Sequence, residues 1–423
     1  MPRFLHTADI HLDSPMVGLE RYDGAPIDRL RSSTRRALKR MVELAIEQRV
    51  DFVLIAGDLY DGTWRDYNTG LFLRKTLEAL IDAKIPVYII AGNHDAQNKM
   101  TRSLSLPEGI TMLETDKPET ISLPEIDVMI HGQGFATAAV TQDLSVRYPA
   151  PVAGCLNIGM LHTCVAGAEG HERYAPCSVE GLRAKGYDYW ALGHIHVRHN
   201  VADDPSIVFP GNLQGRHIRE TGPKGCLIVD LEPGQEPRST FHRLDVMRWE
   251  VCDLDASNLE RPSDLIGLVD QGLRRLLDEE DDPDRLLAVR VRVLGATRWH
   301  EAFVADSARW INEIRAEGLS IDGDRLWIER VKLSTRPRLR ASERDGDGPI
   351  DALMSLVDSY RTDEQKLRDL GDRLADLRRK LPSEFTTGDD PLSLDDPDWL
   401  REMLDRAGPL LLHRLRSASE PRS

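Results

Sequence analysis

The chain has 423 residues, of which 41% are hydrophobic and 30% are charged, and its formal net charge is −15. This length corresponds to about two to four domains, and the apolar fraction excludes a disordered chain. No apolar run approaches the ~20 residues of a membrane-spanning helix, and the N-terminus has no signal-peptide pattern. The acidic charge disfavours generic nucleic-acid binding, because phosphate contacts need Lys and Arg. Five cysteines without close pairs favour a reducing, cytoplasmic location over a disulfide framework or a cysteine-based zinc site.

Strand-like apolar runs alternate with helical stretches along residues 1–240. The strand candidates are residues 4–10, 52–56, 87–91, 128–131, 156–161 and 187–192. Apolar residues recur at helical spacing in residues 34–48 and 71–81. Alternation of this kind predicts a layered α/β domain.

The second half of the chain predicts three further parts. Residues 241–336 read as a small α/β domain, with strands at 248–254, 286–294 and 326–333 and helices at 263–277 and 303–317. Residues 337–349 are polar and contain glycine, as in a linker, and residues 350–423 predict a helical tail. Within this tail, a 3-4-3-4 leucine spacing predicts the seam of a coiled coil or helical hairpin, and a second apolar helix is expected at 399–415. The seam leucines are Leu367, Leu370, Leu374, Leu377 and Leu381.

Five short motifs place metal-ligand side chains at or just past predicted strand ends, where α/β sheets build their sites. They contribute carboxylates, an amide and imidazoles but no cysteine, a set that suits Mn²⁺, Fe or Zn²⁺. The motifs are Asp9-Ile10-His11, Gly57-Asp58, Gly92-Asn93-His94-Asp95, His162 and Gly193-His194-Ile195-His196.

The spacing within these motifs has a physical logic. Residues two apart on a strand face the same way, so Asp9 and His11 can reach one ion. His194 and His196 either face one side together or, if the chain turns at Gly193, serve two neighbouring ions. The two oxygens of Asp58 can bridge ions about 3.5–4 Å apart, a pair that holds a hydroxide and clamps a phosphoryl group for in-line attack.

The ordered set of motifs resembles the calcineurin-like metallophosphoesterase superfamily over residues 1–215. The variant His6-Thr7-Ala8-Asp9-x-His11-Leu12-Asp13-Ser14-Pro15 is similar to the SbcD-like branch of DNA double-strand-break repair exonucleases. Within that branch, residues 162–177 and 210–226 resemble the bacterial YhaO-type proteins. The resemblance implies a four-layer αββα sandwich, followed here by a small α/β capping domain and a helical C-terminal tail.

Carried over by position, the resemblance implies two divalent metal ions, with Mn²⁺ expected and Fe or Zn²⁺ as alternatives. One ion would take Asp9, His11, Asp58 and His196, and the other would take Asp58, Asn93, His162 and His194. His94 would bind no metal. It would instead protonate or stabilise the leaving oxygen, with Asp95 orienting its ring.

Several other residues are weaker candidates. His171, Arg216 and His217 are candidates for contacting substrate phosphate. A basic run that covers more than one helical face is either a solvated surface or a track for a DNA backbone; it comprises Arg29, Arg31, Arg35, Arg36, Lys39 and Arg40. Residues 330–344 carry six Lys or Arg against one Glu, and they are either a solvated linker or a contact for DNA or a partner.

The leading functional prediction is a manganese-dependent nuclease that cleaves DNA phosphodiester bonds in DNA repair. One alternative is a phosphoesterase that acts on small substrates. Another is a DNA-binding adaptor subunit with minor nuclease activity, whose tail docks an SMC-like coiled-coil ATPase. The resemblance also implies that ATPase as a partner of the nuclease, together with a homodimer.

Overall fold

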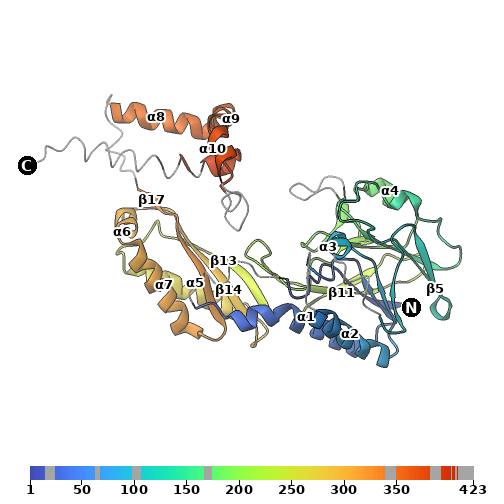
Figure 1. Cartoon of the computed structure of the whole chain (residues 1–423). Helices are drawn as coiled ribbons and strands as arrows, with labels where there is room; N and C mark the ends of the chain where they lie inside the picture. The colour runs from blue at the N-terminus through green and yellow to red at the C-terminus, as the bar shows by residue number, and fades with distance from the viewer. Residues whose placement is uncertain are drawn as a thin grey trace, which may run out of the picture. The chain divides into compact units, whose positions relative to one another are not determined.

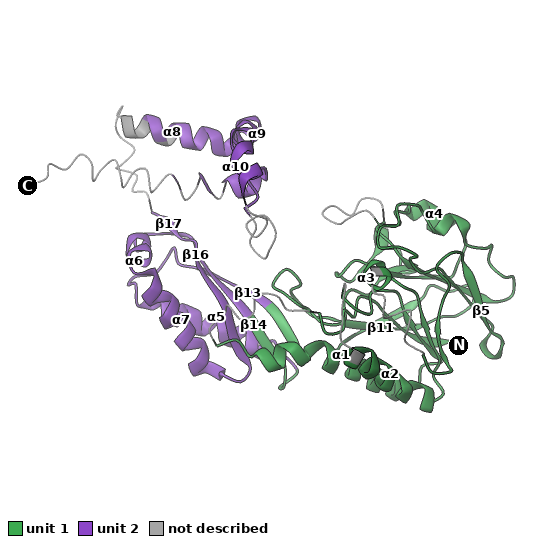
Figure 2. Cartoon of the chain, viewed as in Figure 1, with its two compact units in different colours: residues 1–249, 282–288 green, residues 250–281, 289–423 purple. Residues whose placement is uncertain are grey.

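The structure, a computed structural model, describes residues 1–14, 24–61, 67–97, 106–165, 174–338, 349–381, 392–401, 403–404 and 407. The chain divides into two compact units (Figure 2). The first comprises residues 1–249 and 282–288, and the second comprises residues 250–281 and 289–423. The first unit thus extends past the expected boundary at residue 240. The expected divisions at residues 336 and 349 stay predictions. None of the described helices is both long and apolar enough to cross a membrane.

Two six-stranded sheets form the centre of the first unit among the described residues (Figure 1). The first sheet has the order β12-β11-β1-β2-β3-β4, in which β1 to β4 are parallel. Its strands are β1 (Arg3–Thr7), β2 (Phe52–Ile55), β3 (Val87–Ile89), β4 (Ile110–Met112), β11 (Gly225–Asp230) and β12 (Arg238–Arg243). The second sheet has the order β5-β6-β7-β8-β10-β9. Its strands are β5 (Glu119–Leu123), β6 (Val128–Gly132), β7 (Leu156–His162), β8 (Tyr189–Gly193), β9 (His199–Asn200) and β10 (Ile207–Phe209).

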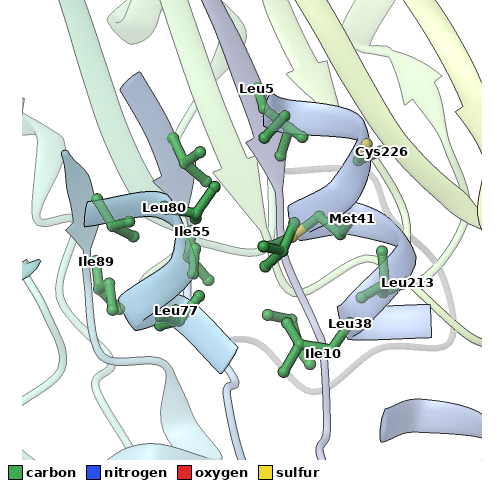
Figure 3. Packing of buried hydrophobic residues seen from close by; sticks show 14 of the residues in the cluster. Leu5, Ile10, Leu38, Met41, Ile55, Leu77, Leu80, Ile89, Leu213 and Cys226 are labelled. Carbon is green, nitrogen blue, oxygen red and sulfur yellow. The ribbon is translucent and has the colours of Figure 1, made fainter. Parts of the chain in front are cut away.

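Alternate side chains along a strand point to opposite faces of its sheet, and the clusters that they join show which layers the sheet separates. In β2, Val53 and Ile55 pack with the helices α1 (Ile27–Glu47) and α2 (Tyr67–Asp82), whereas Phe52 and Leu54 pack between the two sheets. Figure 3 shows the outer cluster, in which Leu38, Met41, Leu77 and Leu80 of the helices meet Leu5, Ile55 and Ile89 of the strands.

On the far face of the second sheet, Trp190 of β8 packs with Leu182 of α4 (Val179–Ala184). The order of layers is therefore helix, sheet, sheet, helix. The predicted αββα sandwich is confirmed.

The second unit contains most of a three-stranded sheet, the helices that pack on it and the tail. Its three-stranded sheet has the order β13-β14-β16, from β13 (Met247–Asp255), β14 (Leu286–Leu294) and β16 (Leu326–Leu333). Gly272 of α5 (Asp264–Asp278) and Gly318 of α7 (Ser307–Asp322) let these helices approach the sheet, because a Cβ there would lie 2.6 Å from Leu254 and 2.7 Å from Ile328. The helix expected at 303–317 is two helices, α6 (His300–Ala305) and α7, since Asp306 has non-helical dihedral angles.

The tail contains α8 (Pro349–Thr362), α9 (Glu364–Arg373) and α10 (Ala375–Lys380). The predicted leucine seam spans α9 and α10, which meet at Leu374, and its role as the seam of a coiled coil or helical hairpin stays a prediction. Leu367 is fully buried, whereas Leu377 is 51% exposed. Of the helix expected at 399–415, residues 397–401, 403–404 and 407 are described and helical, and the rest lies outside the described residues.

Candidate metal centre

The predicted ligands converge because the carboxyl ends of neighbouring strands meet at one edge of each sheet. Asp9 and Asp58 follow β1 and β2 in left-handed conformations, with φ of 50° and 54°. The N–H of Asp9 donates to Gly57 O at 3.0 Å, and that of His11 donates to Asp58 O at 3.0 Å. Backbone held in this sparsely populated region is typical of functional loops.

Glycine is required at two of the motif positions. A Cβ at Gly92 would lie 2.2 Å from Asp58 Oδ1, and one at Gly193 would lie 1.9 Å from Ala56 O. The glycines therefore allow the loops after β2, β3 and β8 to touch. This close approach explains why glycine accompanies the ligand residues in the sequence.

The described residues supply three overlapping sets of ligand atoms, and within each set the atoms lie within 4.8 Å of one another. The sets are Asp9, His11 and His196; His11, Asp58 and His94; and Asp9, Asp58 and His162. Asn93 joins them, since its Oδ1 lies 3.0 Å from His162 Nε2. The His194 ring lies 5.2 Å from that of His162, centre to centre, and its backbone N–H donates to Asp9. All seven predicted ligands thus lie in one region.

The donor set fits a cation for a specific electrostatic reason. His162 Nδ1 donates to Ala56 O at 2.9 Å, so Nε2 carries a lone pair, yet it faces Asn93 Oδ1 at 3.0 Å and Asp58 Oδ2 at 3.5 Å. Burial also lowers the pKa of His162 to about 3, which disfavours a second proton. Electron pairs that face one another at such distances repel unless a cation lies between them.

Two imidazole nitrogens meet at the other side of the centre. His196 Nδ1 lies 2.8 Å from Glu220 Oε1, which fixes the proton on Nδ1, and its Nε2 lies 3.2 Å from His11 Nε2. Burial, followed by the charge of Asp58, raises the pKa of Asp9 well above its usual value, and burial raises that of Asp58 to about 6. Divalent cations would favour the ionised carboxylates and neutral imidazoles.

The structure corrects the expected partner of His94. The Asp95 carboxylate accepts from the backbone N–H groups of Gly92, Leu59 and Tyr60 at 3.0–3.2 Å. Asp61 instead faces the ring, with Oδ1 2.9 Å from His94 Nδ1. The Asp95 carboxylate therefore stabilises the loop after β3 through backbone hydrogen bonds, and the Asp61 carboxylate is the one that faces the His94 ring.

The charges around His94 favour its protonated form. Burial lowers the pKa of His94, but the contact of its Nδ1 with the Asp61 carboxylate and the charge of Asp58 outweigh this effect and raise it. Burial would raise the pKa of Asp61, yet its bonds to His94 and Ser14 hold it at about 2. A 34%-exposed His94 side chain beside the ligand cluster is thus able to hold and release a proton.

The weaker substrate-binding candidates have mixed outcomes. Arg216 Nη2 lies 2.9 Å from Glu220 Oε1, and its Nη1 lies 3.5 Å from Asp61 Oδ2. His217 Nε2 lies 3.6 Å from the same Glu220 oxygen. Both residues therefore adjoin the centre, and their contact with substrate stays a prediction. His171 lies outside the described residues.

Two carboxylates were not identified from the sequence as parts of the site, namely Asp61 and Glu220. Asp61 follows the Gly57-Asp58 motif by three residues, and this was the available signal. Glu220 stands alone between Arg219 and Thr221, a context that carries no metal-site pattern.

A two-sheet α/β fold with these ligands at the strand ends defines a metallophosphoesterase. Residues 2–198 match the family model described as calcineurin-like phosphoesterase, and residues 249–336 match that of the metallophosphoesterase YhaO middle domain. The chain is 35% identical over 277 residues to the "Uncharacterized metallophosphoesterase YhaO" of Bacillus subtilis, covering 64% of this chain and 68% of that protein. The chain belongs to the calcineurin-like metallophosphoesterases, a family of metal-dependent phosphoester hydrolases.

Two further proteins are similar to parts of the chain. The DNA double-strand break repair protein Mre11 of Saccharolobus solfataricus is 25% identical over 295 residues, covering 67% of this chain and 74% of that protein. The crystal structure of a dimetal phosphatase from Danio rerio matches 57% of this chain and 99% of its own, with 13% identity and a TM-score of 0.35.

Proposed function

We propose that the chain is a two-metal DNA nuclease, with Mn²⁺ as its metal, that hydrolyses phosphodiester bonds during DNA repair. The observation that carries this proposal is the similarity to Mre11, a DNA double-strand break repair protein by its printed name. That similarity covers 67% of this chain, which is more than the first unit. It therefore includes residues outside the metal-binding sheets, where substrate selection is expected in a family that shares one core.

The proposed chemistry divides between the ligands and His94. When bound, two divalent cations supply Lewis-acid polarisation of the phosphoryl oxygens and a nucleophile at neutral pH. Asp9, His11, Asp58 and His196 would hold one cation, and Asp58, Asn93, His162 and His194 would hold the other. His94 donates a proton to the departing oxygen of the DNA strand, while Asp61 fixes its ring through Nδ1.

A second function, hydrolysis of small phosphodiesters, is favoured by a specific feature of α1. Two of its arginines are engaged by acids, since Arg35 lies 2.5 Å from Asp13 and Arg40 lies 2.7 Å from Asp282. Neutralised arginines contribute less to a DNA-backbone track. With a net charge of −15, the chain would then rely on the cations to attract DNA.

The proposed partners are DNA, a second copy of the chain, and an SMC-like coiled-coil ATPase that binds the C-terminal helices. The tail supports the last of these with apolar side chains that remain exposed, Leu356 of α8 at 53% and Leu377 of α10 at 51%. If the ATPase interaction dominates, the chain acts as an adaptor with minor nuclease activity. We propose that the protein acts in the cytoplasm, because all five of its cysteines are free thiols.

One assay distinguishes these functions. Labelled single-stranded and double-stranded DNA are compared with bis-p-nitrophenyl phosphate as substrates of the full chain, with Mn²⁺, Mg²⁺ or Zn²⁺. A nuclease cleaves DNA with Mn²⁺, and the His94→Gln variant, purified in parallel, shows that the activity belongs to this chain. Hydrolysis of bis-p-nitrophenyl phosphate without cleavage of either DNA would refute the nuclease proposal and favour a small substrate.

A further inference from the structure

The segment between β10 and β11, residues 210–224, folds around the ligand His196. The carbonyl oxygen of His196 accepts from Lys224 Nζ at 2.9 Å and from the Asn212 N–H at 3.4 Å. The imidazole donates from Nδ1 to Glu220 Oε1 at 2.8 Å. One segment thus holds both the backbone and the ring of this predicted ligand.

The Glu220 carboxylate is surrounded by donors. Oε1 lies 2.8 Å from His196 Nδ1 and 2.9 Å from Arg216 Nη2, and Oε2 lies 2.7 Å from the Arg216 N–H and 3.0 Å from Asn212 Nδ2. The side chain is only 5% exposed. Because both oxygens face donors, an amide in its place would turn an NH₂ group against another donor.

We propose that Glu220 is a positioning residue for the cation centre. Its carboxylate keeps the proton of His196 on Nδ1 and thereby leaves Nε2 unprotonated and available to a cation. This Nε2 atom is the one that lies near Asp9 and His11. Carboxylates that orient metal-binding imidazoles in this way raise the basicity of the ligand as well as fixing its ring. This inference rests on the cation chemistry of the proposed function but not on DNA as the substrate.

Arg216 extends this arrangement towards His94. Its guanidinium lies between two carboxylates, 2.9 Å from Glu220 and 3.5 Å from Asp61, and Asp61 lies 2.9 Å from His94. The loss of Glu220 would leave Arg216 free to shift towards Asp61. We therefore expect turnover to fall together with cation affinity, while the KM for a small substrate changes less.

The test compares Glu220→Gln with Glu329→Gln in the full chain. Glu329 is a matched control, because its buried carboxylate also binds an arginine, with its two oxygens 2.7 and 2.9 Å from Arg290, and it lies in the second unit. Metal-free protein is titrated with Mn²⁺ by calorimetry, thermal unfolding is measured with chelator present, and ¹⁵N shifts of the histidine rings report the tautomer.

We expect Glu220→Gln to weaken Mn²⁺ binding about 10–100-fold, the range for outer-shell partners of metal ligands. Its His196 ring should lose the single Nδ1-protonated signature. Glu329→Gln should lower the unfolding temperature yet bind Mn²⁺ like the unchanged chain. Unchanged affinity and tautomer in Glu220→Gln, or an equal loss of affinity in Glu329→Gln, would overturn the role of Glu220. A failure of the unchanged chain to bind Mn²⁺ would instead refute Mn²⁺ as the cation of the proposed function.

Discussion

The contact between Asp61 and His94 predicts the pH range in which the enzyme works. Replacing Asp61 with Asn keeps the size of the side chain but removes the charge that lies 2.9 Å from His94 Nδ1. Because this charge raises the pKa of His94, its removal lowers that pKa. A smaller fraction of His94 then carries the proton that the leaving oxygen requires at alkaline pH.

The size of the effect follows from the contact. A close contact with a charged group contributes about 1.5–3 kcal/mol, which corresponds to a roughly ten- to hundredfold change in the protonation equilibrium. Since the His94 side chain is 34% exposed, solvent screening places the change near the lower end. We expect the alkaline limb of the kcat–pH profile to move about one pH unit lower in Asp61→Asn. At pH values above the shifted limb, the variant should turn over about tenfold more slowly than the unchanged chain.

The assay measures kcat against pH at saturating Mn²⁺. Its substrate is a labelled dinucleotide, whose alkoxide leaving group needs a proton. Asp95→Asn is the matched control, because the Asp95 carboxylate binds three backbone N–H groups and none from His94. Asp95→Asn should lower the stability of the protein but leave the alkaline limb of the kcat–pH profile where it is in the unchanged chain. If Asp61→Asn leaves the limb in place, or if Asp95→Asn moves it, the assignment of Asp61 as the partner of His94 is wrong.

Four further predictions follow from the site and the tail. Asp58→Ala should weaken both cations together, since it removes the proposed bridging oxygens, and elemental analysis that finds two tightly held ions would contradict it. His94→Gln should keep the metals and slow DNA cleavage about 10²–10⁴-fold, whereas bis-p-nitrophenyl phosphate, whose leaving group needs no proton, should be affected far less. Burial raises the pKa of Asp58 to about 6 and that of Asp95 to about 7. The metal-free chain should therefore lose stability as the pH rises from about 4 to about 7, and the Mn²⁺-induced rise in Tm should grow over the same interval. Changing Leu370 and Leu377 together to Glu should abolish co-purification of the ATPase and spare hydrolysis; unchanged co-purification with a folded tail by circular dichroism would exclude docking through these leucines.

The sequence predicts those elements whose signal is local. Apolar runs followed by ligand motifs identify β1, β2, β3, β7 and β8, and helical spacing identifies α1, α2 and α5. The edge strand β12 carries the exposed, polar sequence of residues 238–243 and pairs with β11, so no periodicity indicated it. The division between α9 and α10 at Leu374 gives no signal either, because the leucine spacing continues across it.

The same distinction applies to the metal centre. The seven predicted ligands occur in motifs at strand ends, and the topology of parallel strands brings such motifs together whatever lies between them. The positions of Asp61 and Glu220 depend on contacts with residues 33 and 24 positions away, as their pairs with His94 and His196 show. A lone acidic residue in a loop gives no indication of which distant imidazole it will meet.

The contacts of the ligands explain how a centre with such conflicts can fold. Asp9 accepts from the His194 N–H at 3.0 Å, Asp58 Oδ1 accepts from the His94 N–H at 2.9 Å, and His162 Nδ1 donates to Ala56 O. Each side chain therefore uses one face for a bond to the backbone and keeps the other for the cation. The backbone bonds preorganise the ligands, and the opposed lone pairs remain as the driving force for binding. The arrangement is thus least stable in the form that binds a cation most readily, with its carboxylates ionised and its imidazoles neutral.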